Sequence, residues 1–169
     1  MVDFEVTDLP ETDHVDVGDE APEFTRPLVG AEYWEDASLA DLSAEGPLLL
    51  VFHPMDGAFP TTYVWNGLRD RGLPDRITTV GCSVSTPYEH CNLLSERGVD
   101  ARLFSDPDAS VGAAYGVEHD LDGMAGVTEH RIATYLIDGD RTVRYAWVAS
   151  QQPEFPNYDA LVAAVDDLV

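Results

Sequence analysis

Residues 47–72 have the sequence PLLLVFHPMDGAFPTTYVWNGLRDRG. The near-continuous apolar run over 47–53 is typical of a strand that is buried on both faces of a sheet. Val64 and Leu68 then recur at helical spacing, after a proline suited to a first helical turn and before a glycine suited to a helix end. The stretch therefore predicts a core strand that is followed directly by a helix over 60–72.

The rest of the chain continues this alternation of strands and helices. Strands are expected over 21–29, with 33–34 as a hairpin partner, and over 77–84, 103–104, 132–137 and 142–148; helical segments are expected over 38–42, 87–97, 111–115 and 158–169. The Asp-Gly pair at Asp138 and Gly139 predicts a tight hairpin, because it supplies the positive φ that such turns need. This order predicts an α/β domain of thioredoxin-like fold, with a mixed central sheet flanked by helices and an N-terminal β-hairpin extension.

The composition is strongly acidic. Among 169 residues, 32 are Asp or Glu and only 9 are Lys or Arg, which gives a formal net charge of −23. Such a chain is a poor partner for nucleic acid or for an anionic membrane surface. Because 44% of the residues are apolar, the charge is expected to coat a folded surface. A carboxylate shell of this density suits a cytoplasm at molar salt, and an ordinary acidic surface is the alternative.

The chain divides into two parts by composition. Residues 1–16 are acidic with scattered apolar positions and are expected to form a loosely attached leader, whereas 17–169 form one domain. No positively charged start precedes an apolar stretch, and no apolar run approaches the length that spans a bilayer. We therefore expect a cytoplasmic protein.

Five short motifs follow one another in a specific order. They are GDEAPEF at 18–24, LVFHPMD at 50–56, FSDPD at 104–108, AYGV at 114–117 and TYLIDGD at 134–140. In this order, over 17–169, the chain resembles the peroxiredoxins of the alkyl hydroperoxide reductase and thiol-specific antioxidant group. The resemblance implies the thioredoxin-like fold, thiol-dependent peroxidase activity as the family function, and no bound cofactor.

The family's catalytic positions carry other residues in this chain. The resemblance implies a reactive cysteine in the first turn of the helix after the core strand, a threonine shortly before it, and an arginine from a later strand. Matched by motif, Thr61 stands at the cysteine, Ala58 at the threonine and Ile132 at the arginine. Only Pro54 of the family's set is retained, so the sequence predicts a degenerate peroxidatic site. A slip or bulge of one residue would bring Arg131 to the arginine position instead.

A threonine cannot replace the thiolate. Its hydroxyl has a pKa far above the ~8.5 of a cysteine thiol, and oxygen cannot form a sulfenic acid. We interpret Thr61 as a helix-start hydroxyl that bonds a nearby backbone N–H. His53, expected at the mouth of the same pocket, is either a substitute for a missing catalytic group or a replacement for an aromatic residue.

Two cysteines offer another route to redox chemistry. Cys82 shares a strand face with an apolar neighbour, and Cys91 lies on the packed face of a helix, so both are expected to be buried structural thiols. The alternative is that one of them is a relocated reactive thiol, or that the two form a pair. No metal site is expected, because the histidines show no metal-ligand spacing; they are His14, His53, His90, His119 and His130.

Two functional hypotheses remain. The first is a degenerate redoxin domain without thiol peroxidase activity that is retained as a binding or assembly module. The second is an antioxidant oxidoreductase that uses Cys82 or Cys91. The resemblance also implies a homodimer, formed through the loops near the active site or by joining sheet edges. Exposed aromatic residues around Thr61 would favour the first route.

Overall fold

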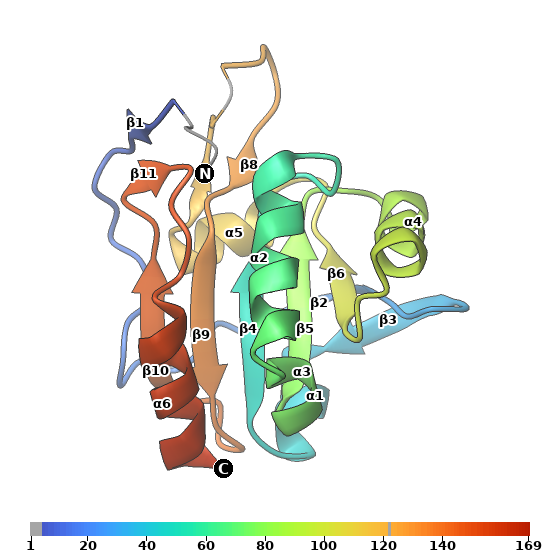
Figure 1. Ribbon diagram of the computed structural model, residues 1–169, viewed down its shortest axis with the longest axis vertical. Helices are drawn as coiled ribbons and strands as arrows, with labels where there is room; N and C mark the ends of the chain where they lie inside the picture. Colours follow the sequence, from blue (N-terminus) through green and yellow to red (C-terminus); the bar gives the residue numbers. More distant parts are fainter. Residues whose placement is uncertain (1–4, 122) are drawn as a thin grey trace.

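The computed structural model describes residues 5–121 and 123–169 and contains a central sheet of seven strands in the order β10-β9-β4-β5-β6-β2-β3 (Figure 1). The strands are β2 (Thr25–Val29), β3 (Trp34–Ser38), β4 (Leu48–Phe52), β5 (Thr78–Ser83), β6 (Arg102–Ser105), β9 (Ala133–Ile137) and β10 (Val143–Val148). Strands β4, β5 and β6 are parallel, and the other pairs in this sheet are antiparallel. The prediction of a mixed α/β domain with an N-terminal hairpin is therefore confirmed.

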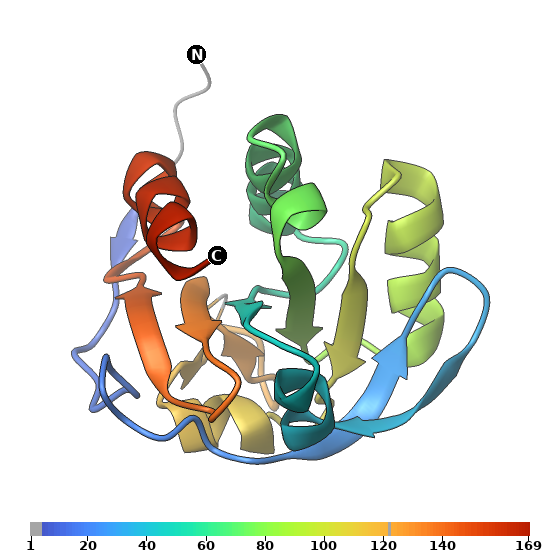
Figure 2. The ribbon, with the colours of Figure 1, turned by 90° about the horizontal axis from the view of Figure 1, so that it is seen from below.

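Helices cover both faces of the sheet (Figure 2). They are α1 (Leu39–Ala44), α2 (Phe59–Asp70), α3 (Leu73–Arg76), α4 (Pro87–Arg97), α5 (Ser110–Tyr115) and α6 (Tyr158–Leu168). Helices α2, α4 and α6 pack on one face, whereas α1 and α5 pack on the other. Strand β4 is buried at all five positions because it lies between these two layers, which explains its uninterrupted apolar sequence.

The side chains of β4 and β5 alternate between two cores. On the α1/α5 side the core includes Leu50, Phe52 and Cys82, and on the α2/α4/α6 side it includes Leu49 and Val51. We call these the lower core and the upper core, after their places in Figure 2. A residue's position in the strand therefore decides which of the two layers its side chain contacts.

Two local predictions were inaccurate. The helix expected over 60–72 ends at Asp70, because Gly72 takes a left-handed conformation (φ 66°) that stops it and the short α3 follows. In the β9–β10 hairpin, the positive φ falls on Arg141 (φ 62°) and not on Gly139. The loop is longer than a two-residue turn, with the Arg141 N–H donating to the carbonyl of Asp138 (3.0 Å).

The described part of the N-terminal segment, predicted to be a loosely attached leader, forms hydrogen bonds with the domain. Strand β1 (Thr7–Asp8) pairs with β11 (Gln151–Gln152), and the Leu9 N–H donates to the Ser150 carbonyl (2.9 Å). Further along, Thr12 Oγ1 donates to the carbonyl of Gly116 (2.7 Å). Backbone hydrogen bonds that composition does not reveal thus hold the described part of the leader, whereas residues 1–4 lie outside the described residues.

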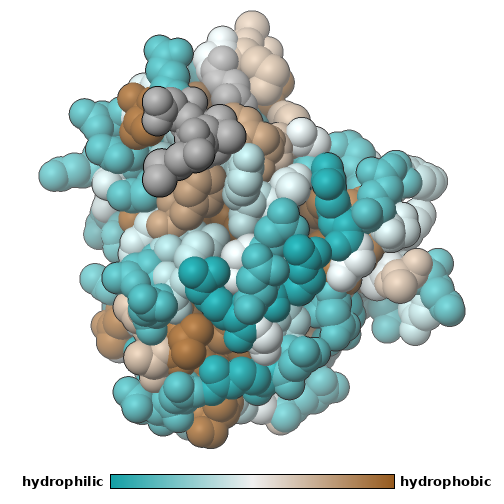
Figure 3. Space-filling model, in the orientation of Figure 1, coloured by the Kyte–Doolittle hydropathy of each residue, from teal (hydrophilic) through white to brown (hydrophobic). Residues whose placement is uncertain are grey.

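The molecular surface is mostly hydrophilic in the view of Figure 3. This agrees with a net charge of −23 carried by a chain whose apolar residues fill two cores. Within the described residues, no helix combines the length and apolarity needed to cross a bilayer.

Candidate functional site

The loop between β4 and α2, together with the first turn of α2, contains four of the predicted site residues, which are His53, Pro54, Ala58 and Thr61. Thr61 lies in the first turn of α2 and is fully buried. Its Oγ1 is within hydrogen-bonding distance of the carbonyls of Pro54 (3.0 Å) and Met55 (2.9 Å), and its N–H donates to the carbonyl of Ala58 (3.2 Å). The predicted bond from a backbone N–H to this hydroxyl is therefore wrong: the hydroxyl is a donor that ties the loop to the helix.

The other two matched positions, Ala58 and Ile132, carry apolar side chains. Ala58 is the N-cap residue of α2 and makes no side-chain capping bond, since a methyl group has no acceptor. Ile132 is fully buried in the upper core, which also contains Val64 and Trp65 of α2. Neither position supplies a hydroxyl or a guanidinium to the Thr61 turn.

Arg131 lies away from the Thr61 turn. Its Nη1 donates to the carbonyls of Pro10 (3.1 Å) and Ala149 (3.2 Å), and the residue lines a cavity with segments 9–14 and 148–150. Its neighbour Ile132 is the residue that faces α2, because consecutive side chains point to opposite sides of an extended chain.

His53 is buried beneath α2 and does not lie at a pocket mouth. It contacts Trp65 edge to face, with ring centroids 5.7 Å apart, and its Nδ1 donates to the carbonyl of Pro54 (2.9 Å). Its Nε2 has no hydrogen-bond partner. Burial lowers the pKa of His53 from 6.5 to about 4, although the nearby Asp56 carboxylate acts in the opposite direction. His53 is therefore a neutral ring that packs as an aromatic residue.

The two cysteines lie on opposite sides of the sheet. Cys82 is fully buried in the lower core, and burial, followed by the nearby Asp106 carboxylate, raises the pKa of its thiol well above the ordinary value. Cys91 is half-buried on α4 and packs against the upper core. With the sheet between them, the two thiols cannot form a disulfide in this fold.

A buried pair of Asp56 and His90 lies next to the Thr61 turn. Asp56 Oδ2 is 2.5 Å from His90 Nδ1, and Ser83 Oγ donates to Asp56 Oδ1 (3.2 Å). The other ring nitrogen of His90, Nε2, donates to the carbonyl of Phe104 (3.1 Å). Both ring nitrogens of His90 therefore face oxygen atoms within hydrogen-bonding distance.

A second pair of the same kind joins Asp106 to His130. His130 Nε2 lies 2.9 Å from Asp106 Oδ2, and its Nδ1 faces the carbonyl of Cys82 at 3.3 Å. The carboxylate also accepts hydrogen bonds from the backbone N–H groups of Val111 (3.2 Å) and Gly112 (3.1 Å). Asp106 therefore caps the start of α5 as well as binding the ring.

Cys82, together with Asp106 and His130 of this second pair, could hold a metal ion. Ligand atoms of Cys82, Asp106 and His130 lie within 4.8 Å of one another, and all three residues are buried. They come from three separate elements, so no ligand spacing in the sequence indicates them. The set offers a thiol, a carboxylate and an imidazole, a mixture that suits zinc or another borderline divalent ion once the thiol is deprotonated.

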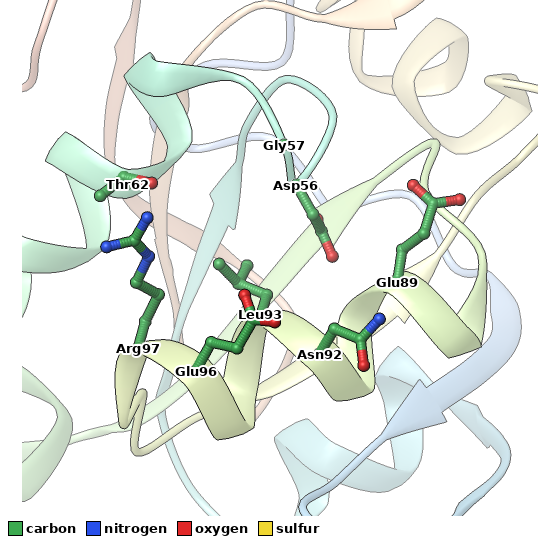
Figure 4. A pocket seen from close by; sticks show the side chains of 8 residues that line it. All are labelled: Asp56, Gly57, Thr62, Glu89, Asn92, Leu93, Glu96 and Arg97. Atoms are coloured by element: carbon green, nitrogen blue, oxygen red, sulfur yellow. The ribbon is translucent and has the colours of Figure 1, made fainter.

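A surface cavity of about 270 Å³ lies between the Asp56 loop and α4 (Figure 4). Asp56 points toward α4, whereas Arg97 extends from α4 toward Thr62. Glu89 and Glu96 add two carboxylates to the lining. The cavity could receive a small polar ligand beside the Thr61 turn, and it contains no thiol.

The motif analysis missed the two histidine–aspartate pairs, although one signal for them exists. Asp56 follows β4 and Asp106 follows β6, and both strands belong to the parallel part of the sheet. The carboxyl ends of parallel strands meet at one edge, where polar groups converge. Chain order alone does not reveal that His90 and His130 reach the same edge.

Comparisons with known proteins agree with this architecture. The family model described as AhpC/TSA matches residues 17–146. A protein of Bacillus subtilis named thiol peroxidase is 25% identical over 160 residues, which cover 92% of this chain and 89% of that protein.

Solved structures show the same fold. The peroxidoxin BcpB of Mycobacterium tuberculosis superposes with a TM-score of 0.73 at 24% identity, covering 92% of this chain and 97% of that chain. AhpC of Enterococcus faecalis gives a TM-score of 0.75 at 13% identity, covering 89% of this chain and 90% of that chain. Since the family model spans well over half of the sequence, this chain belongs to the AhpC/TSA peroxiredoxin family.

Proposed function

We propose that this protein is a degenerate peroxiredoxin-like domain without conventional thiol peroxidase activity, retained as a binding or assembly module. The observation that carries the proposal is the Thr61 hydroxyl. It occupies the motif position of the peroxidatic cysteine and is within hydrogen-bonding distance of the carbonyls of Pro54 and Met55. A fully buried hydroxyl that donates to these carbonyls has neither the acidity nor the access of a peroxide-reducing group.

The positions of the remaining groups also support the proposal. Peroxidase chemistry needs an exposed, low-pKa thiolate beside a cationic or N–H-rich site. Cys82 is buried with a raised thiol pKa, and Cys91 lies on α4 on the other side of the sheet. Arg131, the substitute considered for the family's arginine, binds the carbonyls of Pro10 and Ala149 instead.

We predict that the purified protein at molar salt does not accelerate the oxidation of dithiothreitol by hydrogen peroxide. The measurement is peroxide consumption together with the mass of the intact chain after substoichiometric peroxide, and we expect no added oxygen at either cysteine. Turnover that disappears in Cys82→Ser or Cys91→Ser would refute the proposal and identify the reactive thiol.

Thr61→Cys provides the matched variant, because it places a thiol in the first turn of α2. With Ala58 and Ile132 unchanged, we expect this thiol to react with peroxide no faster than a small free thiol. Adding Ala58→Thr and Ile132→Arg tests whether the scaffold still supports the family chemistry.

The alternative function is an antioxidant thiol-dependent oxidoreductase. The observation that favours it is the relative in Bacillus subtilis, which is named a thiol peroxidase. Cys91, half-buried on α4, is the more accessible of the two thiols. The peroxide experiment distinguishes this alternative from a binding module.

A binding or assembly role has two structural supports. The cavity of about 270 Å³ beside Asp56 offers room for a small ligand. Phe59 and Tyr63, which flank Thr61 in sequence, are 48% and 44% exposed. This favours dimerisation through the loops near the family's active site over joining of sheet edges. Sedimentation of the wild type and of Tyr63→Ser at molar salt tests the dimer.

We also propose that the protein works in a salt-rich cytoplasm. A net charge of −23 repels itself in dilute buffer, and salt screens this repulsion. The midpoint of thermal unfolding should therefore rise steadily as potassium chloride increases from about 0.1 M, where the Debye length is ~10 Å, to molar concentrations, where it is ~3 Å. A midpoint that is unchanged over this range would favour an ordinary acidic surface.

A further inference from the structure

The cluster of Cys82, Asp106 and His130 brings three kinds of metal-binding group together in the interior. Cys82 belongs to β5, Asp106 follows β6, and His130 is the last residue of β8 (Glu129–His130). All three residues are fully buried. The cluster therefore differs from the exposed groups of carboxylates that a chain with 32 acidic residues carries by composition alone.

The two ring nitrogens of His130 face two oxygen atoms. Nδ1 lies 3.3 Å from the carbonyl oxygen of Cys82, and Nε2 lies 2.9 Å from Oδ2 of Asp106. A neutral imidazole carries one N–H group and can donate to only one of these oxygens. With the proton on Nδ1, the ring donates to a backbone carbonyl, as metal-binding histidines commonly do, and Nε2 presents a lone pair to the carboxylate. A cation is then needed between Nε2 and Oδ2.

The carboxylate of Asp106 is held in place by donors outside the cluster. The backbone N–H of Val111 donates to Oδ1 (3.2 Å), and that of Gly112 donates to Oδ2 (3.1 Å). Such outer contacts orient a metal-binding carboxylate and maintain its charge. Asp106 and His130 thus both have the supporting hydrogen bonds that metal ligands have in proteins.

The charges of the cluster match those of a divalent cation. A thiolate and a carboxylate together neutralise such an ion, and the imidazole adds a neutral ligand, so the occupied site has no net charge in the interior. Arg26 opposes a second cation, because its Nε lies 3.4 Å from Asp106 Oδ1. Its guanidinium is shared with Asp108 (3.7 Å), however, and it lies against the oxygen that does not face His130.

The dimensions and the donor types favour zinc. Zinc bonds of about 2.0–2.3 Å place two ligands at the tetrahedral angle roughly 3–4 Å apart. The ligand atoms of the cluster lie within 4.8 Å of one another, so shifts of about 1 Å or less bring them to these separations. The ion takes the place of the protons on the donors. Magnesium and calcium prefer oxygen ligands, so a thiol and an imidazole do not suit them.

We infer that Cys82 Sγ, Asp106 Oδ2 and His130 Nε2 bind one zinc ion, with a water molecule as the fourth ligand. The thiol proton of Cys82 passes to the buffer when the sulfur binds the ion. The ion joins β5, the β6–α5 loop and β8, which are far apart in the sequence. This inference goes beyond the binding or assembly role proposed above and does not depend on it.

Cobalt(II) is the probe, because its bond to a thiolate gives a charge-transfer band in the near ultraviolet. The full chain is unfolded in urea, freed of metal, and refolded under reducing conditions at molar potassium chloride with increasing cobalt(II) chloride. Excess magnesium chloride occupies the exposed carboxylates. We expect the band to saturate at one cobalt ion per chain. Adding an equal amount of zinc during refolding should suppress it, since zinc binds such ligands more tightly.

The two cysteines provide a matched pair of variants. Cys91→Ser removes the only other thiol, which packs on the opposite side of the sheet, and should retain the band. Cys82→Ala should abolish the band and weaken cobalt binding by at least about 100-fold, the upper end of the cost of losing an outer-shell partner.

Two readouts do not require Cys82→Ala to fold. Refolded wild type that shows no charge-transfer band at saturating cobalt would overturn the inference, whether or not cobalt binds to carboxylates elsewhere. A band that is lost in Cys91→Ser would assign the ion to the other thiol and would overturn it as well. A band that persists in folded Cys82→Ala has the same meaning.

Discussion

Asp106→Ala is expected to lower the free energy of unfolding by about 3–5 kcal/mol, the usual cost of removing one partner from a buried charged pair. Asp106 is fully buried and lies 2.9 Å from His130 Nε2. It also accepts from the N–H groups of Val111 and Gly112 at the start of α5. Removing the carboxylate leaves all three donors buried without their acceptor.

The measurement is urea unfolding at constant high salt, followed by tryptophan fluorescence. Asp108→Ala is the matched control, because Asp108 lies two residues further on, is exposed and contacts Ser110 and Arg26. We expect it to destabilise the fold far less than Asp106→Ala does, because solvent screens the contacts of an exposed carboxylate. If Asp106→Ala were no more destabilising than Asp108→Ala, the buried pair would not hold α5 to the sheet.

His53 is expected to make the fold sensitive to mild acid. Burial lowers its pKa from 6.5 to about 4 in the folded protein, with Asp56 opposing this shift and His90 adding to it. Between these two pH values the unfolded chain binds a proton that the folded chain does not. His53 therefore contributes no destabilisation above pH 6.5, and stability falls as the pH drops toward 4, by about 3 kcal/mol in total.

His53→Phe isolates this contribution. A phenyl ring keeps the contact with Trp65, and loss of the Nδ1 bond still leaves the Pro54 carbonyl near the hydroxyl of Thr61. Between pH 7 and pH 5 the wild type should lose about 2 kcal/mol more than the variant, measured by urea unfolding at both values. Equal losses would show that His53 is not the group that titrates.

The sequence predicted the framework of the fold because its signals are local. The apolar run over 47–53 and the helical spacing after it correspond to β4 and α2, and the ordered motifs gave the family. Motif register also placed Thr61 in the first turn of α2. The sequence did not predict the direction of the Thr61 hydrogen bond. That direction depends on which carbonyls the loop turns toward the hydroxyl.

Contacts between distant segments were decided only by the tertiary structure. Asp56 and His90 are 34 residues apart, Asp106 and His130 are 24 apart, and Arg131 meets Pro10 across 121 positions. Periodicity and turn chemistry report on neighbours a few residues away, so they do not reveal such pairs. By itself, the sequence determined the layered α/β framework and the position of Thr61 in the first turn of α2. The packing of parallel strand ends and the docking of the N-terminal segment decided which buried charges have partners, because both bring together groups from distant parts of the chain.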